Sequence, residues 1–142
     1  MARVVNSRAL DSKLASFARE GINVTTALLK GAVRTQTAMV ESINEGGGTG
    51  KSHTPSEPGD APNTNTGRLV GSIASGSPGH NAAEVTVSAE YGLPLEDGAV
   101  FENGRVLAPR PFARPAYKKT IPYVLDQVRK EERAELRRRA RG

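Results

Sequence analysis

Apolar residues recur at helical spacing along the first third of the chain. One stripe comprises Leu10, Leu14, Phe17, Val24, Leu28, Ala32, Thr35, Met39 and Ile43. At about 3.6 residues per turn this pattern predicts one long helix over residues 7–45, with Ser7 as its N-cap and the glycine run after Glu45 as its end. Gly21 and Gly31 lie inside the stripe. They indicate a kink, a close helix contact, or a break near Gly21 that gives two helices.

Residues 46–65 have no hydrophobic period and almost no large apolar side chains. Glycine and proline are frequent there, so the segment is expected to be a long flexible loop. Its Gly50-Lys51-Ser52 sequence is similar to the end of a phosphate-binding P-loop. That motif requires a glycine five positions before Gly50, where this chain has Glu45, so we do not expect nucleotide binding.

Residues 66–109 are expected to form a small antiparallel sheet of three to four strands with short helical turns. Strict alternation over residues 83–89 predicts a strand, and residues 69–76 are its expected hairpin partner across a Gly- and Ser-rich turn over residues 75–82. Thr66 is placed to cap a short helical turn that precedes this hairpin. In that turn Leu69 and Ile73 are expected to face inward.

Two short elements follow in the same region. Residues 91–98 predict a helical turn or bend closed by Gly98, in which Tyr91 and Leu95 share one surface. Asn103-Gly104 is the strongest two-residue hairpin signal in the chain, and apolar residues flank it on both sides. A second small hairpin is therefore expected within residues 99–109.

A C-terminal helix over residues 110–128 is expected to begin in the sequence Arg110-Pro111-Phe112-Ala113-Arg114-Pro115-Ala116. Proline is tolerated in the first helical turn, and Phe112 is placed to enter the core. Arg110 and Arg114 would share a face of such a helix and could bind a carboxylate or phosphate, or else form ion pairs with Glu96 or Glu102. Thr120-Ile121-Pro122 suggests a second cap within this segment.

Composition narrows the possible functions of the 142-residue chain, which is expected to be a single α+β domain. With 37% hydrophobic residues, 15 Gly and 9 Pro, the core is thin, as in a subunit completed by neighbouring copies or in a loop-rich monomer. There is no cysteine, and the two histidines lie in loop-like stretches. We therefore expect no catalytic residues, metal or cofactor, and no enzyme activity. No apolar run is long enough to span a membrane, and no export signal is present.

The positive charge of the chain is concentrated at its C-terminal end. The net charge is +5, and the basic residues of the last helical stretch are Arg129, Lys130, Arg133, Arg137, Arg138, Arg139 and Arg141. We expect residues 129–142 to form a basic helical extension. Such an extension could contact DNA or an acidic partner, or could simply be a solvated helix end.

Three motifs occur in a characteristic order. They are Thr66-Gly67-Arg68-Leu69 with Ser72-Ile73, then Tyr91 with Leu95-Glu96 and Gly98, then Arg110-Pro111-Phe112 with Arg114-Pro115-Ala116. Over roughly residues 8–130 the chain resembles the neck, or tail-completion, family of long-tailed bacteriophages, which is lambda minor tail protein Z-like. One departure is that Asp97 and Ala99 stand where the family usually has an aromatic residue and a threonine.

The resemblance implies a structural protein of the virion and not an enzyme. Its motif residues would form the assembly framework of a homo-oligomeric ring, expected to have six copies, at the head–tail junction. The ring would join the capsid connector to the tail tube, contact neighbouring neck proteins, and surround packaged DNA without reading its sequence. It would assemble in the bacterial host cytoplasm.

Two other interpretations remain open at this point. The first is the related role of a tail-terminator ring subunit, which the sequence does not separate from a neck role. The second is a basic nucleic-acid-binding protein that uses the C-terminal helix. Against the second, the six Tyr and Phe residues are scattered, and no helix-turn-helix or zinc pattern is present.

Overall fold

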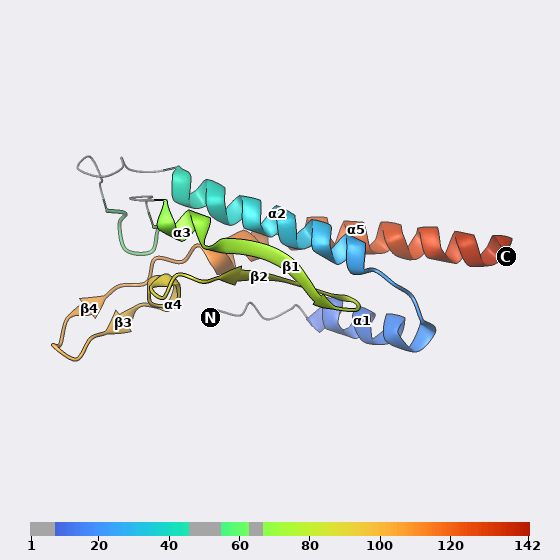
Figure 1. Ribbon diagram of the computed structural model, residues 1–142, viewed down its shortest axis with the longest axis horizontal. Coiled ribbons are helices and arrows are strands. Elements are labelled where there is room, and N and C mark those ends of the chain that lie inside the picture. The colour runs from blue at the N-terminus through green and yellow to red at the C-terminus, as the bar shows by residue number, and fades with distance from the viewer. Residues whose placement is uncertain (1–7, 46–54, 63–66) are drawn as a thin grey trace.

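The computed structural model describes residues 8–45, 55–62 and 67–142, and over these ranges the chain has the expected α+β fold (Figure 1). The elements in chain order are α1 (Arg8–Glu20), α2 (Thr25–Asn44), α3 (Arg68–Gly71), β1 (Ile73–Gly79), β2 (Ala82–Val87), α4 (Gly92–Asp97), β3 (Ala99–Val100), β4 (Val106–Leu107) and α5 (Ala113–Arg141). The proposed caps Ser7 and Thr66, and most of the loop predicted over residues 46–65, lie outside the described residues.

The single helix predicted over residues 7–45 is wrong, because the chain breaks at Gly21 into α1 and α2. Gly21 has φ +67°, a left-handed conformation that glycine adopts without steric penalty. The Ile22 N–H donates to the Phe17 carbonyl at 3.0 Å, as in a Schellman motif, and both side chains are buried. The break therefore follows from a glycine C-cap with its usual hydrophobic contact.

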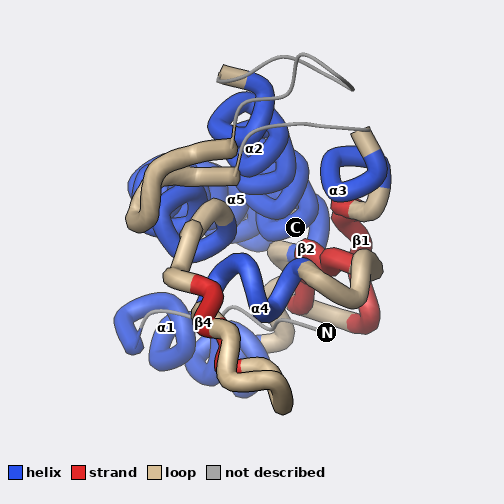
Figure 2. Tube along the Cα trace, turned by 90° about the vertical axis from the view of Figure 1, so that its left-hand side faces the viewer, coloured by secondary structure: helices blue, strands red, loops and turns tan. Residues whose placement is uncertain are grey.

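Helix α2 contacts both α5 and the β1–β2 hairpin, while α1 lies below α2 and α5 in Figures 1 and 2. At Gly31 of α2, an added Cβ would stand 2.7 Å from a methyl carbon of Val124 in α5. The second glycine of the stripe thus allows the predicted close helix approach. Buried Thr35 and Thr120 hydroxyls meet at 2.7 Å across the same interface.

The strands form two separate antiparallel hairpins and not the single sheet of three to four strands that was expected. In the first, Ile73 pairs with Val87, and the strands extend to Gly79 and Ala82. The turn is therefore His80–Asn81 and not residues 75–82. The second hairpin has only two residues in each strand, and its connection over residues 101–105 contains the predicted Asn103-Gly104 pair but is longer than a two-residue turn. Helix α4 lies between the two hairpins along the chain, and the strands of each hairpin pair only with each other.

The turn residue Asn81 fastens the first hairpin to the α1–α2 connection. Its side-chain amide donates to the Ile22 carbonyl, and its amide oxygen accepts the Val24 N–H, both at 2.8 Å. The Asn81 backbone N–H donates to the Thr25 hydroxyl at 2.9 Å. These bonds satisfy the polar groups of a connection whose apolar side chains are buried.

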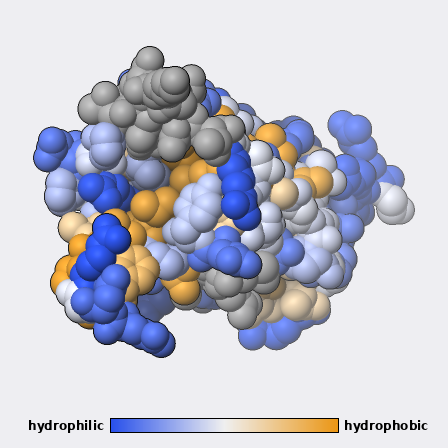
Figure 3. Space-filling view, turned by 60° about the vertical axis from the view of Figure 1, so that its left-hand side comes forward, coloured by the Kyte–Doolittle hydropathy of each residue, from blue (hydrophilic) through white to orange (hydrophobic). Residues whose placement is uncertain are grey.

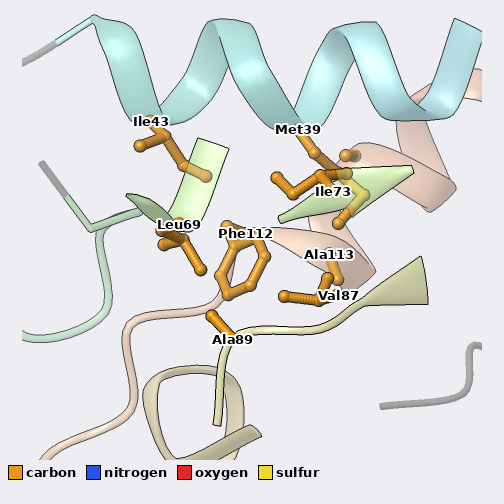
Figure 4. Close-up of a cluster of buried hydrophobic side chains, with 9 residues drawn as sticks. Met39, Ile43, Leu69, Ile73, Val87, Ala89, Phe112 and Ala113 are labelled. Carbon is orange, nitrogen blue, oxygen red and sulfur yellow. The ribbon is translucent and has the colours of Figure 1, made fainter. Parts of the chain in front are cut away.

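Two hydrophobic clusters form the core. The first joins α2, the β1–β2 hairpin and the start of α5 around Phe112 (Figure 4), and comprises Met39, Ile43, Leu69, Ile73, Val87, Ala89, Phe112, Ala113 and Ala116. The second joins α1, α2 and the middle of α5, and comprises Leu10, Phe17, Ile22, Val24, Ala27, Leu28, Val124 and Val128. The predicted inward positions of Leu69, Ile73 and Phe112 are confirmed.

Helix α5 is continuous from Ala113 to Arg141, so the predicted cap at Thr120-Ile121-Pro122 is wrong. The Thr120 hydroxyl donates to the Ala116 carbonyl one turn earlier instead of capping a new helix. Pro122 lacks an N–H, so the helix loses one backbone hydrogen bond at this point. Packing of Val124 and Val128 in the second cluster keeps the helix intact beyond the proline.

Candidate assembly surface

A single carboxylate, Glu96, joins α4 to the beginning of α5. One Glu96 oxygen accepts the N–H groups of Phe112 at 2.8 Å and Ala113 at 2.9 Å, and the other accepts the Arg114 N–H at 2.9 Å. Glu96 is only 3% exposed. A negative charge at a helix N-terminus also interacts favourably with the helix dipole.

The local sequence provides no other cap for the backbone N–H groups at the start of α5. Phe112, the N-cap residue, has no side chain that could cap the helix. The residue after Arg114 is Pro115, which has no backbone N–H to satisfy. Glu96 therefore satisfies all the N–H groups that the first turn presents. This explains in physical terms why Leu95-Glu96 and Arg-Pro-Phe-Ala-Arg-Pro belong together in one chain.

Arg110 and Arg114 do not bind a common anion, which corrects the expectation of a shared face. Helix α5 begins only at Ala113, so Arg110 lies before it. The Arg110 guanidinium donates to the Ser56 carbonyl at 3.2 Å. Arg114 forms an ion pair with Asp97, and the hydrogen bond that its guanidinium donates to that carboxylate raises the pKa of Arg114. Arg114 also lies 3.9 Å from Glu96, so the predicted intrachain alternative is the one observed for Arg114.

The other motif residues support the same region. Gly67, with φ +75°, precedes α3, and the Arg68 guanidinium lies 5.8 Å from the ring centre of Tyr91. The Ser72 carbonyl accepts the Ser88 N–H at 3.1 Å, which extends the first hairpin. Gly98 has φ +77°, and an added Cβ would stand 2.8 Å from the Leu107 carbonyl oxygen. The three motifs thus meet around one junction between α3, α4 and α5.

The β3–β4 hairpin projects from this junction at the end of the molecule opposite the C-terminus (Figure 1). Its apolar side chains are largely solvent-exposed, beside the exposed polar residues Glu102, Asn103 and Arg105: Val100 is 76% exposed, Val106 74% and Phe101 47%, and Leu93 of the adjoining α4 is 44% exposed. Val100 and Val106 pair across the two strands and so lie on one face, which we call the apolar hairpin face. Figure 3, which brings this end forward, shows apolar surface here bordered by hydrophilic atoms.

Three of the seven C-terminal basic residues are engaged in contacts within the chain. Lys130 pairs with Asp126 at 3.0 Å, and Arg138 pairs with Glu135 at 2.7 Å and with Glu131 at 3.2 Å. Arg139 pairs with the same Glu135. These three residues are therefore only partly available to an external partner.

Arg139 also closes the C-terminal end of α1. Its guanidinium donates to the carbonyls of Glu20 and Gly21, both at 2.9 Å. The sequence contains no local signal for this contact or for the Asn81 contacts, because each joins segments that are far apart in the chain. Hydrogen bonds from Arg138 and then Arg139 lower the pKa of Glu135.

Comparisons with known protein families, curated proteins and solved structures find no match to this chain. Among the described residues, no helix is sufficiently long and apolar to cross a lipid bilayer. The same residues contain no group of three or more His, Cys, Asp or Glu side chains that could hold a metal ion. The junction and the apolar hairpin face therefore remain the features from which a function can be argued.

Proposed function

We propose that this chain is a ring-forming subunit of the neck, or tail-completion, region of a long-tailed bacteriophage. In this role it joins the capsid connector to the tail tube around the DNA passage. The observation that carries the proposal is the apolar hairpin face, which a monomer would leave in water. The three motifs that resemble the phage family lie around the junction that holds this hairpin.

The hairpin is unusual for a surface element of an isolated protein. Val100 and Val106 face each other as a cross-strand pair and yet are about three-quarters exposed. A two-stranded hairpin is only marginally stable by itself, and exposed apolar patches commonly mark interaction sites. Contact with another copy would bury these side chains and add neighbours to both strands.

The position of the hairpin favours a ring over a symmetric dimer. It projects at one end of an elongated molecule, opposite the C-terminal end of α5, so the two ends of the molecule present different surfaces (Figure 1). A contact between two different surfaces of the same chain is heterologous, and such contacts close into rings when the rotation between copies allows it. Six copies and a location at the head–tail junction belong to this proposal.

The proposal is tested with the variant Val100→Thr/Val106→Thr, which keeps β-branched side chains but removes apolar surface. We expect the unaltered protein to form a labile oligomer, detected by concentration-dependent sedimentation and by cross-linking. The double variant should remain a monomer with an unchanged far-UV circular dichroism spectrum. Val33→Thr is the matched control, because Val33 is also exposed but lies on α2. Equal assembly of the hairpin variant and the control would contradict the proposal.

A second test uses the virus itself. Deletion of this gene from its phage should give particles whose heads and tails fail to join firmly. Particles with full-length, firmly joined tails and retained DNA would overturn the neck role. Locating the subunit in images of the intact particle separates a neck position from the alternative tail-terminator position.

A further inference from the structure

Helix α5 sorts its charges around its axis. At about 100° per residue, seven basic side chains fall within an arc of about 140° on the side opposite buried Val124 and Val128. These outward residues are Lys118, Lys119, Arg129, Lys130, Arg133, Arg137 and Arg141, and all seven are exposed. We call them the outward basic face.

Three of the four acidic residues of α5, Glu131, Glu132 and Glu135, occupy the other side. Glu132 pairs with Lys13 of α1 at 2.9 Å, and Glu131 and Glu135 pair with Arg138 and Arg139. Within α5, all of which the structure describes, the only acidic residue of the outward arc is Asp126, which pairs with Lys130. The helix thus neutralises its inward charges within the chain and leaves six outward cations without a carboxylate partner among the described residues.

We propose that the outward basic face binds the sugar–phosphate backbone of duplex DNA without reading its sequence. This inference rests on the proposed function, since it identifies the surface that would face the DNA passage. From Lys118 to Arg141 the face runs for about 35 Å along the helix. Duplex DNA presents about one negative charge per 1.7 Å of its axis, so an extended row of cations matches a uniform polyanion.

The composition of the face favours a duplex over other acidic partners. Its centre carries no large apolar side chain, whereas protein interfaces are usually centred on apolar or aromatic anchors. Leu136 lies only at its edge. Binding of single strands usually depends on several exposed aromatic rings, whereas this face has one at its edge, Tyr123, which is 38% exposed and lies 5.6 Å from the Arg34 guanidinium.

The experiment measures binding of the full chain to two short DNA duplexes of unrelated sequence, by fluorescence anisotropy between 50 and 200 mM NaCl. We expect equal Kd values for the two duplexes, because phosphate contacts carry no sequence information. The variant Arg129→Gln/Arg133→Gln/Arg137→Gln should reduce the slope of log K against log salt by about 2.7, from about 0.9 per lost contact. At 100 mM NaCl its affinity should fall by roughly 100-fold or more.

The matched control is Arg8→Gln/Arg19→Gln/Lys30→Gln, which removes the same charge from exposed positions on α1 and α2. It should bind DNA nearly as well as the unaltered protein. Equal losses in the two triple variants, a preference for one duplex, or binding to an acidic protein without binding to duplex DNA would each overturn the inference. Sedimentation of the same variants separates this result from the proposed function, because the outward variant should still form the oligomer that the hairpin variant loses.

Discussion

Replacing Glu96 by alanine tests the junction on which the apolar hairpin face depends. The substitution leaves the N–H groups of Phe112 and Ala113 buried without an acceptor, and that of Arg114 half-buried. Hydrogen bonds to charged groups contribute about 1.5–3 kcal/mol each, and buried unsatisfied donors cost about 1–3 kcal/mol. Because the three bonds share one side chain and are not additive, we expect the free energy of unfolding to fall by about 3–5 kcal/mol.

This loss is large compared with the total stability of a small domain, which is about 5–15 kcal/mol. Glu96→Gln should lose less, about 1–3 kcal/mol, because one amide oxygen can still accept two of the three N–H groups. The amide nitrogen then faces the Arg114 N–H, so that one donor opposes another. The difference in unfolding free energy between Glu96→Ala and Glu96→Gln therefore reports the number of hydrogen-bond acceptors and not merely the presence of a side chain.

The measurement is urea unfolding followed by circular dichroism at 222 nm, together with amide hydrogen exchange at Phe112 and Ala113. Exchange of these two amides should accelerate more than that of the other amides in α5. Glu90→Ala is the control, because Glu90 is an exposed carboxylate close in the chain, and it should change stability by less than about 0.5 kcal/mol. A loss of under about 1 kcal/mol in Glu96→Ala, with unchanged exchange, would refute the reasoning.

Two further predictions concern the helices. Gly31→Ala should lower the free energy of unfolding by about 1 kcal/mol, because the added methyl group would stand 2.7 Å from a methyl carbon of Val124 and the overpacking costs more than the gain in helix propensity. Val124→Ala should partly restore the stability of this variant, as measured by a double-mutant cycle of unfolding free energies. Because its folded-state pKa is lowered, Glu135 contributes stability above the usual glutamate pKa of about 4.3 that is lost as pH falls through the lowered value. Protection factors of the amides in the last turns of α5, taken relative to the intrinsic exchange rate at each pH, should therefore fall on acidification, and less so in Glu135→Gln.

Patterns that act over a few residues were predictable from the sequence. The helical stripe located α2, alternation located β2, and Asn103-Gly104 located the second hairpin, because each depends on local backbone geometry. Gly21 was recognised as a possible break, but the stripe continues across it. The left-handed conformation of Gly21 and the local Schellman contact between Ile22 and Phe17 end α1 there, although the apolar period alone does not distinguish this end from a continuing helix.

Contacts between distant segments were not predictable in the same way. The order of the motifs placed Glu96 and Arg-Pro-Phe in one pattern, but the only role considered for Glu96 was an ion pair with an arginine side chain, as one alternative. The pattern of charged residues does not predict that Glu96 accepts hydrogen bonds from backbone N–H groups. Asn81 is an ordinary turn residue in the sequence, and only the fold brings its amide to Ile22 and Val24.

The distribution of charges around α5 was only partly predictable from the sequence. The helical period alone separates outward Arg133 from inward Glu135, whereas the prediction was a single basic helical extension. The helical period does not identify the partner of each inward charged residue. Lys13 and the end of α1 provide those partners, and they come from the opposite end of the sequence.

The contact of α1 with the distal part of α5 has a consequence for how the molecule is made. Arg139 reaches the carbonyl of a residue 119 positions earlier, so this part of the core closes one of the longest loops the chain can form, and loops of that length form slowly. On a ribosome, α1 is made before α5, so Phe17 and Leu10 are covered only after Val124 and Val128 in the middle of α5 have been made. A newly made subunit therefore exposes the apolar side of α1 until α5 follows, which delays any productive contact between copies until translation has passed α5.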